Sequence, residues 1–308
     1  MRGKLTLLLV CAMSFLLTGC RKEENLLNIR EEEIIIPTLE RDYELFFIAD
    51  SHVTLCDKKD SELIEKNNAR KESFIRNGKS SDWYFKELVK EAKNRKSDLI
   101  VMGGDIVDSA MYASIDFVKK QLDSSGLDYI YASGNHDFEY GDEYFSSLAY
   151  EKYRPRLEVI HSPKFYDIKE YDDLIIFSVD DEANQIPKEA VEAFAEIVKK
   201  DKAIIVVTHV PFEPLTGDLA LNELCKETWG ESSDGKSRVT MGFNGCYPNS
   251  NTLDFAELLA YSKNVYGILA GHVHFYHKDI FYDNKYQIIT AAAFEGQAIS
   301  VRLKSSRD

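Results

Sequence analysis

The sequence predicts an α/β fold of two mixed sheets flanked by helices, a sandwich contained in a single domain. Apolar runs typical of strands alternate with helical patterns through most of the chain, and strands alone follow near its end. The early runs are almost continuously apolar, as expected for strands that are covered on both faces. A length of 308 residues, with 44% hydrophobic and 29% charged residues, suits a soluble globular protein of this size.

Turn and capping residues divide the chain into its expected elements. Asp82 and Thr252 are suited to cap helices, and Pro187 suits the first turn of another. A polar stretch at 57–79 interrupts the alternation, and we expect an excursion of helix and loop there. The main expected helices cover 82–96, 113–122, 187–200 and 252–261, and the expected strands cover 34–36, 44–49, 99–102, 129–132, 174–179, 203–207, 265–270, 278–281, 286–292 and 298–303.

The N-terminal region is expected to be a targeting segment followed by a tether. Arg2 and Lys4 precede an apolar stretch at 5–17 that is too short to span a bilayer comfortably. The next residues, Leu-Thr-Gly-Cys ending at Cys20, resemble a bacterial lipobox, in which Cys20 would be lipidated. An ordinary secretory signal with a chance cysteine is the alternative. We predict an exported protein anchored to a lipid bilayer, divided into a signal peptide at 1–19, a lipid-anchored tether at 20–40 and a domain at 41–308.

The charge of the chain argues against one class of partner. The formal net charge is −14. An acidic protein without a basic stripe repels the phosphate backbone of nucleic acids. We therefore expect no nucleic-acid partner, and no obligate protein partner is evident from the sequence.

Three cysteines follow Cys20, and export would permit a disulfide between two of them. Cys225 and Cys246 lie in one loop-like region and are the candidate pair, although two free thiols are equally compatible with the sequence. Because no Cys-x-x-Cys pattern occurs, a zinc–thiolate site is not indicated.

Side chains of metal-ligand type follow five of the apolar runs. In open α/β sheets, ligands bind beyond the carboxyl ends of the strands, so these side chains are expected to gather at one edge. Glycines precede several of them, where the backbone must turn sharply or approach an ion closely. Five of the seven histidines belong to these motifs, which are Asp50-Ser51-His52, Gly104-Asp105 with Asp108, Gly134-Asn135-His136-Asp137, His209, and Gly271-His272-Val273-His274.

The composition of this ligand set predicts the kind of metal. Imidazoles mixed with carboxylates and one carboxamide suit Zn, Mn, Fe or Ni better than Ca or Mg alone. The set is too large for one ion, but two divalent metal ions that share a carboxylate would use all of it. Two such ions a few ångströms apart are a known arrangement for attack on phosphate esters. The identity of the metal stays open at this point.

The five motifs, in this order from Asp50 to His274, resemble those of the calcineurin-like metallophosphoesterases. The resemblance implies a two-sheet sandwich with a dinuclear centre in which Asp105 bridges the two metals. It also implies that His136 protonates the leaving group, that Asp137 orients His136, and that Asp108 supports its own loop. The implied ligands are Asp50, His52, Asp105 and His274 for one metal, and Asp105, Asn135, His209 and His272 for the other.

The function that this resemblance implies is metal-dependent hydrolysis of a phosphate ester, either a monoester or a diester. A hydroxide bridging the two metals would attack phosphorus, with His136 as the general acid. The alternative is a non-catalytic cell-surface binding protein that keeps the fold, but the complete ligand set argues against it. A metal-dependent nuclease is disfavoured by the acidic charge.

Residues 210–251 are expected to form a cap-like loop insertion that follows the ligand His209 and chooses the substrate. Arg238 could hold a phosphate, and Trp229 is the main candidate to stack on the substrate. A surface loop that packs only on itself is the alternative. Residues with weaker expectations are Phe212, Phe243 and Tyr247 as further stacking groups, Phe294 and Glu295 as lining of the pocket, Asp180 and Asp181 as a solvated turn, and His161 and His277 as surface histidines.

Overall fold

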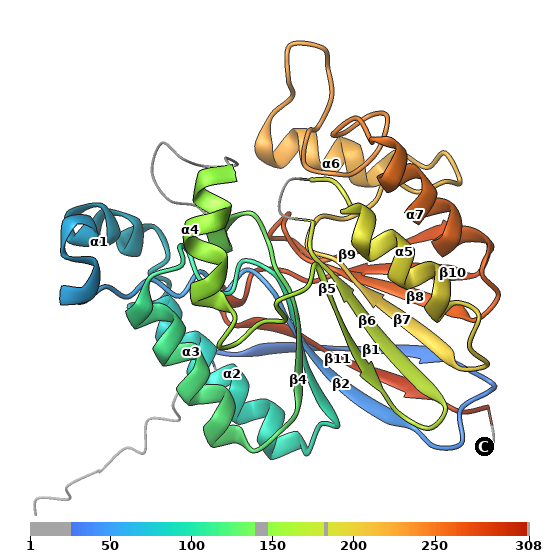
Figure 1. Cartoon of the computed structure of the whole chain (residues 1–308), viewed down its shortest axis with the longest axis horizontal. Coiled ribbons are helices and arrows are strands. Elements are labelled where there is room, and N and C mark those ends of the chain that lie inside the picture. The colour runs from blue at the N-terminus through green and yellow to red at the C-terminus, as the bar shows by residue number, and fades with distance from the viewer. Residues whose placement is uncertain (1–25, 139–146, 182–183, 307–308) are drawn as a thin grey trace, which may run out of the picture.

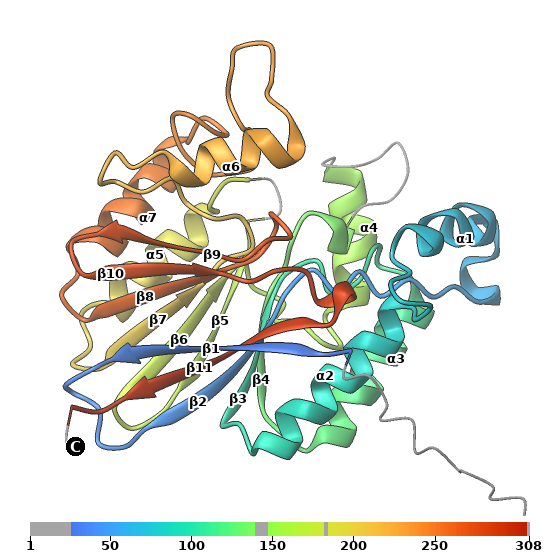
Figure 2. The same ribbon diagram turned by 180° about the vertical axis from the view of Figure 1, so that it is seen from behind.

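The protein is described here by a computed structural model that covers residues 26–138, 147–181 and 184–306. Two mixed β-sheets pack face to face, and helices cover the outer face of each sheet (Figures 1 and 2). This four-layer arrangement in one domain is the fold that the sequence predicts. Over the residues described, no helix is long and apolar enough to cross a membrane.

The first sheet has the strand order β1-β11-β2-β3-β4. Strands β2, β3 and β4 run parallel, so their carboxyl ends lie at the same edge, while β11 is antiparallel to β2 and parallel to β1. The strands of this sheet are β1 (Asn28–Ile35), β2 (Tyr43–Ile48), β3 (Leu99–Gly103), β4 (Tyr129–Ala132) and β11 (Gln297–Lys304).

The second sheet has the strand order β5-β6-β7-β8-β10-β9. Its four inner strands run parallel, and an antiparallel strand closes each edge. The strands of this sheet are β5 (Tyr166–Glu170), β6 (Leu174–Val179), β7 (Ala203–Val207), β8 (Val265–Ala270), β9 (His277–Tyr282) and β10 (Lys285–Ile289).

The helices lie on the outer faces and over the edge where the parallel strands end (Figure 1). The α-helices are α1 (Ile64–Ser73), α2 (Ser81–Arg95), α3 (Tyr112–Ser125), α4 (Ser147–Leu157), α5 (Lys188–Ile197), α6 (Ala220–Trp229) and α7 (Ser250–Tyr261). Short 3-10 helices are η1 (Lys58–Leu63), η2 (His136–Phe138) and η4 (Ala293–Glu295).

Strand β2 shows why the strand sequences are almost continuously apolar. Leu45 and Phe47 lie in the core between the two sheets, whereas Phe46 and Ile48 lie in the core under α2 and α3. All four side chains are fully buried. Because each face of the sheet is covered, the alternation of apolar and polar residues that marks a half-exposed strand is lost.

Part of the segment expected to be a tether, at 20–40, is a strand of the first sheet. Residues 28–35 form β1, which pairs along its whole length with β11. Its acidic composition suggested a solvated tether, but β1 is an edge strand and keeps charged side chains at the surface. Glu32, whose side chain is largely shielded, is compensated there by Lys278 of β9 at 2.7 Å and by a hydrogen bond from the hydroxyl of Tyr276. The predicted signal peptide and Cys20 lie outside the described residues.

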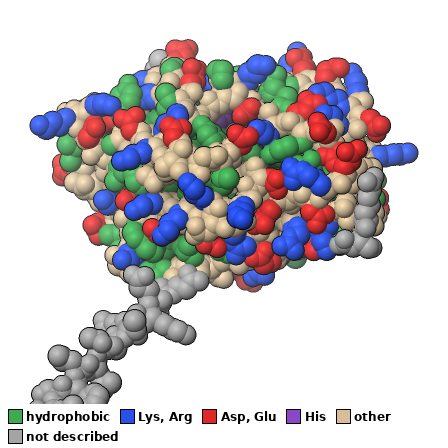
Figure 3. All heavy atoms as spheres, turned by 90° about the horizontal axis from the view of Figure 1, so that it is seen from below, with side chains coloured by type: hydrophobic (Ala, Val, Ile, Leu, Met, Phe, Trp, Pro, Cys, Tyr) green, Lys and Arg blue, Asp and Glu red, His purple; other side chains and the backbone are tan. Residues whose placement is uncertain are grey.

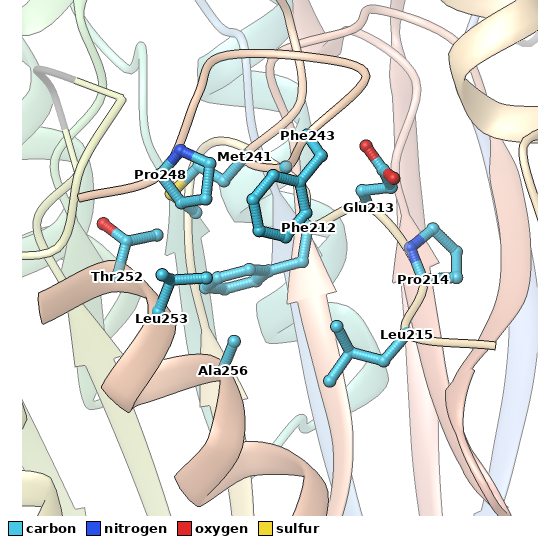
Figure 4. A pocket seen from close by; sticks show the side chains of 11 residues that line it. Phe212, Glu213, Pro214, Leu215, Met241, Phe243, Pro248, Thr252, Leu253 and Ala256 are labelled. Atoms are coloured by element: carbon cyan, nitrogen blue, oxygen red, sulfur yellow. The ribbon is translucent and has the colours of Figure 1, made fainter. Parts of the chain in front are cut away.

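The segment at 210–251 is more ordered than the expected loop, because α6 forms its centre and a buried cluster holds it in place. Phe212 and Met241 are both buried, and they line a small cavity of about 50 Å³ against α7 (Figure 4). Cys225 is buried on α6, and neither it nor Cys246 is disulfide-bonded. The segment is therefore packed on the domain without the Cys225–Cys246 disulfide that the sequence permitted.

Candidate metal centre

The structure brings all seven predicted metal ligands together at the seam between the two sheets. They follow the carboxyl ends of β2, β3 and β4 in the first sheet and of β7 and β8 in the second. Because these strands are parallel within each sheet, the ends of neighbouring strands meet at one edge. The ligands are Asp50 and His52 after β2, Asp105 after β3, Asn135 after β4, His209 after β7, and His272 and His274 after β8.

One group of ligand atoms combines both sheets. The Nε2 atoms of His52 and His274 lie 3.3 Å apart, and the Nε2 of His274 lies 3.4 Å from Oδ1 of Asp50. At this distance either one of the two Nε2 atoms carries a proton that it donates to the other, or a cation lies between two lone pairs. Asp50, His52 and His274 form one of the geometrically possible metal-binding groups.

A second group surrounds His209. Its Nε2 lies 3.2 Å from Oδ2 of Asp105, 3.1 Å from Nδ1 of His272 and 3.2 Å from Oδ1 of Asn135. Its Nδ1 lies 2.8 Å from the carbonyl oxygen of Gly103, which fixes Nδ1 as the donor and leaves Nε2 for a metal.

Asp105 belongs to the second group and also lies close to the first. Its Oδ2 lies 3.2 Å from Nε2 of His209 in the second group and 3.8 Å from Nε2 of His52 in the first. Its other oxygen, Oδ1, accepts a hydrogen bond of 2.7 Å from the backbone N–H of His136. One carboxylate is thereby held between the two groups, which is the position that the predicted bridging role requires.

The backbone at these strand ends is strained in a way that the sequence does not reveal. Asp50, His52, Asp105, His272 and His274 all have φ between 44° and 73°, in the left-handed region that side chains other than glycine rarely adopt. Each costs on the order of 1–3 kcal/mol and persists only where the surrounding structure enforces it. The strain turns the chain sharply at the end of each strand and directs the ligands into the seam.

The glycines of the motifs are required by the close approach of neighbouring ligands. A Cβ at Gly104, where φ is 85°, would lie 2.4 Å from Nδ1 of His209. A Cβ at Gly134 would lie 2.4 Å from Oδ1 of Asp105. The sequence analysis expected a sharp turn or a close approach to an ion at these glycines, whereas the groups that approach them closely in the structure are the side chains of His209 and Asp105.

The electrostatics of the cluster favour bound cations. Burial alone would raise the pKa of Asp105, but His209 and His136 outweigh it and hold that pKa well below its usual value. Burial alone would lower the pKa of His209, but Asp105 outweighs it and raises that pKa to about 10. Burial together with the charge on His209 lowers the pKa of His272 to about 3. The buried carboxylates therefore demand positive charge at the seam, and the nitrogen and oxygen donors fit divalent metals.

His136 lies beside this cluster, but Asp137 does not orient it. The Nδ1 of His136 lies 3.3 Å from Oδ1 of Asp108. The carboxylate of Asp137 instead accepts hydrogen bonds from the backbone N–H groups of Asp105 (2.9 Å), Val107 (3.0 Å) and Gly134 (2.8 Å), and from the hydroxyl of Tyr131 (2.6 Å). Asp137 thus joins two ligand loops, and the role expected of it at His136 passes to Asp108.

Asp180, Asp181 and His161 were expected at the surface, but all three are buried. Asp181 accepts hydrogen bonds from the backbone N–H groups of His209 (3.1 Å) and Val210 (3.0 Å), and burial raises its pKa to about 8. Asp180 pairs with His161 (2.9 Å) and Arg154 (3.2 Å). The sequence did carry a signal of this burial, namely two carboxylates directly after an apolar run. Acids at the end of a buried strand are stable there only when they are paired or hydrogen-bonded.

The rim of the centre is formed on one side by aromatic side chains. The ring of Trp229, which is 48% exposed, stands edge-to-face at 5.1 Å from the ring of His274, and its Nε1 donates a hydrogen bond of 3.0 Å to the carbonyl oxygen of Val273. Phe294 is buried against the rings of His52 and His274. Trp229 and Phe294 therefore both border the candidate ligands, and the stacking of Trp229 on a substrate stays a prediction.

The other residues expected to contact a substrate lie elsewhere. Arg238 is exposed and pairs with Asp234 at 3.3 Å, and within the described residues no contact joins it to the ligand cluster. Phe243 and Tyr247 are exposed and pack on each other, and Phe212 is buried. On the face seen in Figure 3, Lys and Arg are interspersed with Asp and Glu, without a basic stripe.

Comparison with known proteins agrees with this geometry. The family model of the calcineurin-like phosphoesterases matches residues 44–276, so the chain belongs to this family. It is accordingly a hydrolase that acts on phosphoester bonds, in a family that depends on metal. No curated protein matches the sequence at a significant level.

Solved structures show the same fold at low sequence identity. A dimetal phosphatase from Danio rerio superposes with a TM-score of 0.52 and 12% identity, covering 89% of this chain and 94% of that one. A purple acid phosphatase from seeds of yellow lupin (Lupinus luteus) gives a TM-score of 0.50 and 14% identity, covering 89% of this chain and 47% of that one. At such identities the likeness concerns the fold alone.

Proposed function

We propose that the protein hydrolyses a phosphate ester, a monoester or a diester, at a centre of two divalent metal ions. The single observation that supports this most is the position of Asp105, whose Oδ2 lies within 4 Å of a histidine from each ligand group, at 3.2 Å from His209 and 3.8 Å from His52. Asp50, His52 and His274 would hold one ion with Asp105, and Asn135, His209 and His272 would hold the other. The metals, when bound, would offset charge on the phosphoryl oxygens and lower the pKa of a bound water.

His136 is the general acid of this proposal. Its ring is partly exposed at the rim and stands edge-to-face against His52 at 4.9 Å, and with His52 and Asp108 it forms a third cluster beside the two groups to which the metals are assigned. Because its Nδ1 faces Asp108, its Nε2 is the nitrogen left to donate a proton to the leaving oxygen. Within this proposal Trp229 contacts the organic part of the substrate, whereas the phosphate-binding role predicted for Arg238 finds no support in its exposed position beside Asp234.

The proposal places the reaction outside the cytoplasm. Cys20 would carry the lipid anchor after removal of residues 1–19, and the domain would follow a short tether that ends at β1. Labelling of the protein in cells with a radioactive or clickable fatty acid tests this part. Label that is lost in Cys20→Ala is expected, and label that persists in Cys20→Ala would contradict the anchor.

A metal-resolved assay tests the reaction. The chain without residues 1–20 is purified, its metal content is measured, and aryl phosphomonoesters and phosphodiesters are offered with Mn, Fe, Zn or Ni. About two metals per chain, together with hydrolysis that depends on them, are expected. A protein that binds no metal and hydrolyses neither kind of ester under any of these conditions would overturn the proposal.

A further inference from the structure

Asp108 connects a candidate metal ligand to the general acid. Its Oδ1 lies 3.2 Å from Nδ1 of His52 and 3.3 Å from Nδ1 of His136. Both rings therefore direct Nδ1 toward the same carboxylate. A rotation of the Asp108 carboxylate would disturb the two histidines together.

Arg70 fixes the orientation of that carboxylate. Its Nε donates to Oδ2 of Asp108 at 2.7 Å, and its NH2 group donates to Oδ1 at 2.5 Å. The NH2 group also lies 3.5 Å from Nδ1 of His136. A planar guanidinium that bonds both oxygens sets the rotation of a carboxylate, which a lysine with its single point charge does not.

Arg70 comes from the polar excursion between β2 and β3, whose part in the function the sequence does not reveal. It lies on α1, a helix whose one buried residue is Asn67, so α1 adds almost nothing to the hydrophobic core. The guanidinium of Arg70 lies over the ring of Phe74 at 5.1 Å, and Phe74 in turn stacks on His52 at 4.5 Å. The excursion therefore contacts the centre through two residues: Arg70 binds Asp108, and Phe74 stacks on His52.

We propose that Arg70 is a positioning residue, which holds Asp108 so that one carboxylate orients both His52 and His136. This inference rests on the proposed function, because the role of His136 as general acid belongs to it. It makes the excursion at 57–79 part of the active site, although no residue of the excursion is a metal ligand.

The consequence depends on the leaving group of the substrate. A general acid accelerates the departure of a poor leaving group, such as an alkoxide, far more than that of 4-nitrophenolate, which leaves readily as an anion. Loss of the Arg70 contact would misalign His136 and would therefore slow alkyl phosphates selectively. A substitution that only loosens the fold would slow both substrates by the same factor.

The experiment compares Arg70→Ala, Arg70→Lys and Lys71→Ala in the full-length protein purified in detergent. Lys71→Ala is the matched control, because it removes the same charge from the next position of α1. For Arg70→Ala we expect kcat with an alkyl phosphate to fall about 10–100-fold, a much smaller fall with 4-nitrophenyl phosphate, and a nearly unchanged KM. Arg70→Lys should recover only part of the loss, and Lys71→Ala should match the wild type.

A second measurement does not depend on activity. Side-chain ¹⁵N spectra of the metal-free protein report which nitrogen of each histidine carries the proton. We expect the Nδ1–H form for His52 and His136 in the wild type and in Lys71→Ala, and a mixture of tautomers for His136 in Arg70→Ala.

The proposal is overturned if the kinetic loss in Arg70→Ala is equal for both substrates, or if the tautomer of His136 is unchanged. If Arg70→Ala does not fold, as its melting temperature would show, Arg70→Lys decides by the same two measurements. If the wild type hydrolyses no ester with any metal, the proposed function fails, and the spectra still decide whether Arg70 positions His136.

Discussion

The two sheets contribute different chemistry to the metal centre. The strand ends of the first sheet supply all of the oxygen ligands and one imidazole, whereas those of the second supply imidazoles alone. Neither sheet holds a complete group, since Asp50 and His52 need His274, and Asp105 needs His209. The centre therefore exists only when the sheets are packed together, and the buried core between them also sets the distances between ligands.

The sheets also differ in how their ends are supported. In the first sheet, Asp137 accepts hydrogen bonds from the ligand loops after β3 and β4. In the second sheet, β6 ends in two buried acids, of which Asp181 holds the backbone of His209 and Asp180 pairs with Arg154. The acids after β6 thus support the site without supplying a candidate metal ligand. Because they belong to none of the five ligand motifs, the sequence indicated only an ordinary turn at this position.

The largest effect is expected from removing Asp105, the carboxylate that lies between the two ligand groups. Asp105→Ala should reduce hydrolysis by about 10³-fold or more, a larger loss than that of a single preorganised donor, because both groups lose an oxygen ligand. Metal content measured by mass spectrometry should fall toward zero. His274→Ala, which removes a ligand of one group, is the comparison. Retention of both metals and near-normal activity in Asp105→Ala would contradict the shared role.

Crowding at the seam is tested by two glycines that both have positive φ. Gly104→Ala should lower metal affinity about 10–100-fold, because its methyl group would displace His209 from its hydrogen bond to Gly103. Gly126→Ala carries the same backbone strain with no atom within 4 Å, and should cost only about 1–2 kcal/mol of stability. Metal titration and urea unfolding separate the two effects. Equal metal affinity in both variants would show that the seam tolerates a methyl group.

Asp180, the buried acid that directly follows β6, predicts that the stability of the protein depends on pH. Burial alone would raise the pKa of Asp180, but His161 and Arg154 outweigh it and lower that pKa. A lowered pKa in the folded state stabilises the protein above the ordinary aspartate value of about 3.9, and this contribution is lost as the pH falls toward the folded pKa.

Asp180→Asn should therefore cost roughly 3 kcal/mol of unfolding free energy at neutral pH, because it leaves the charge of Arg154 without its partner. The difference from the wild type should shrink below about pH 4. Urea unfolding at a series of pH values measures it. A difference that stays constant down to acid pH would mean that the charge of Asp180 contributes nothing.

The smallest expected effect concerns the rim. Trp229→Phe keeps an aromatic ring beside His274 but loses the hydrogen bond to Val273, a change of about 1 kcal/mol. We expect KM to rise several-fold for esters with a planar organic group, with kcat and metal content nearly unchanged. Arg238→Ala, on the exposed part of the same segment, is the control for the substrate role predicted for that arginine. A change in kcat with an unchanged KM would contradict this role, because it would mean that Trp229 acts on the metal ligands and does not contact the substrate.

Much of the site was predictable because its residues stand in local patterns. An apolar run followed by Asp, Asn or His requires only the knowledge that parallel strands end at one edge, so Asp105, His209 and His274 could be placed together. The role of Asp137 could not, because it depends on which way a side chain points within the turn of η2. Arg70 gave no signal, since nothing near it in the chain relates α1 to Asp108.

By itself, the sequence determined the class of fold and indicated the candidate ligands, because strand burial and ligand chemistry depend on residue type and spacing. Tertiary structure alone decided which carboxylate faces His136, that Asp180 and Asp181 are buried supports, and that β1 is part of the first sheet. These outcomes depend on contacts between residues far apart in the chain, such as Arg70 with Asp108 and Glu32 with Lys278. Such contacts form only when the two sheets and their connecting segments have packed.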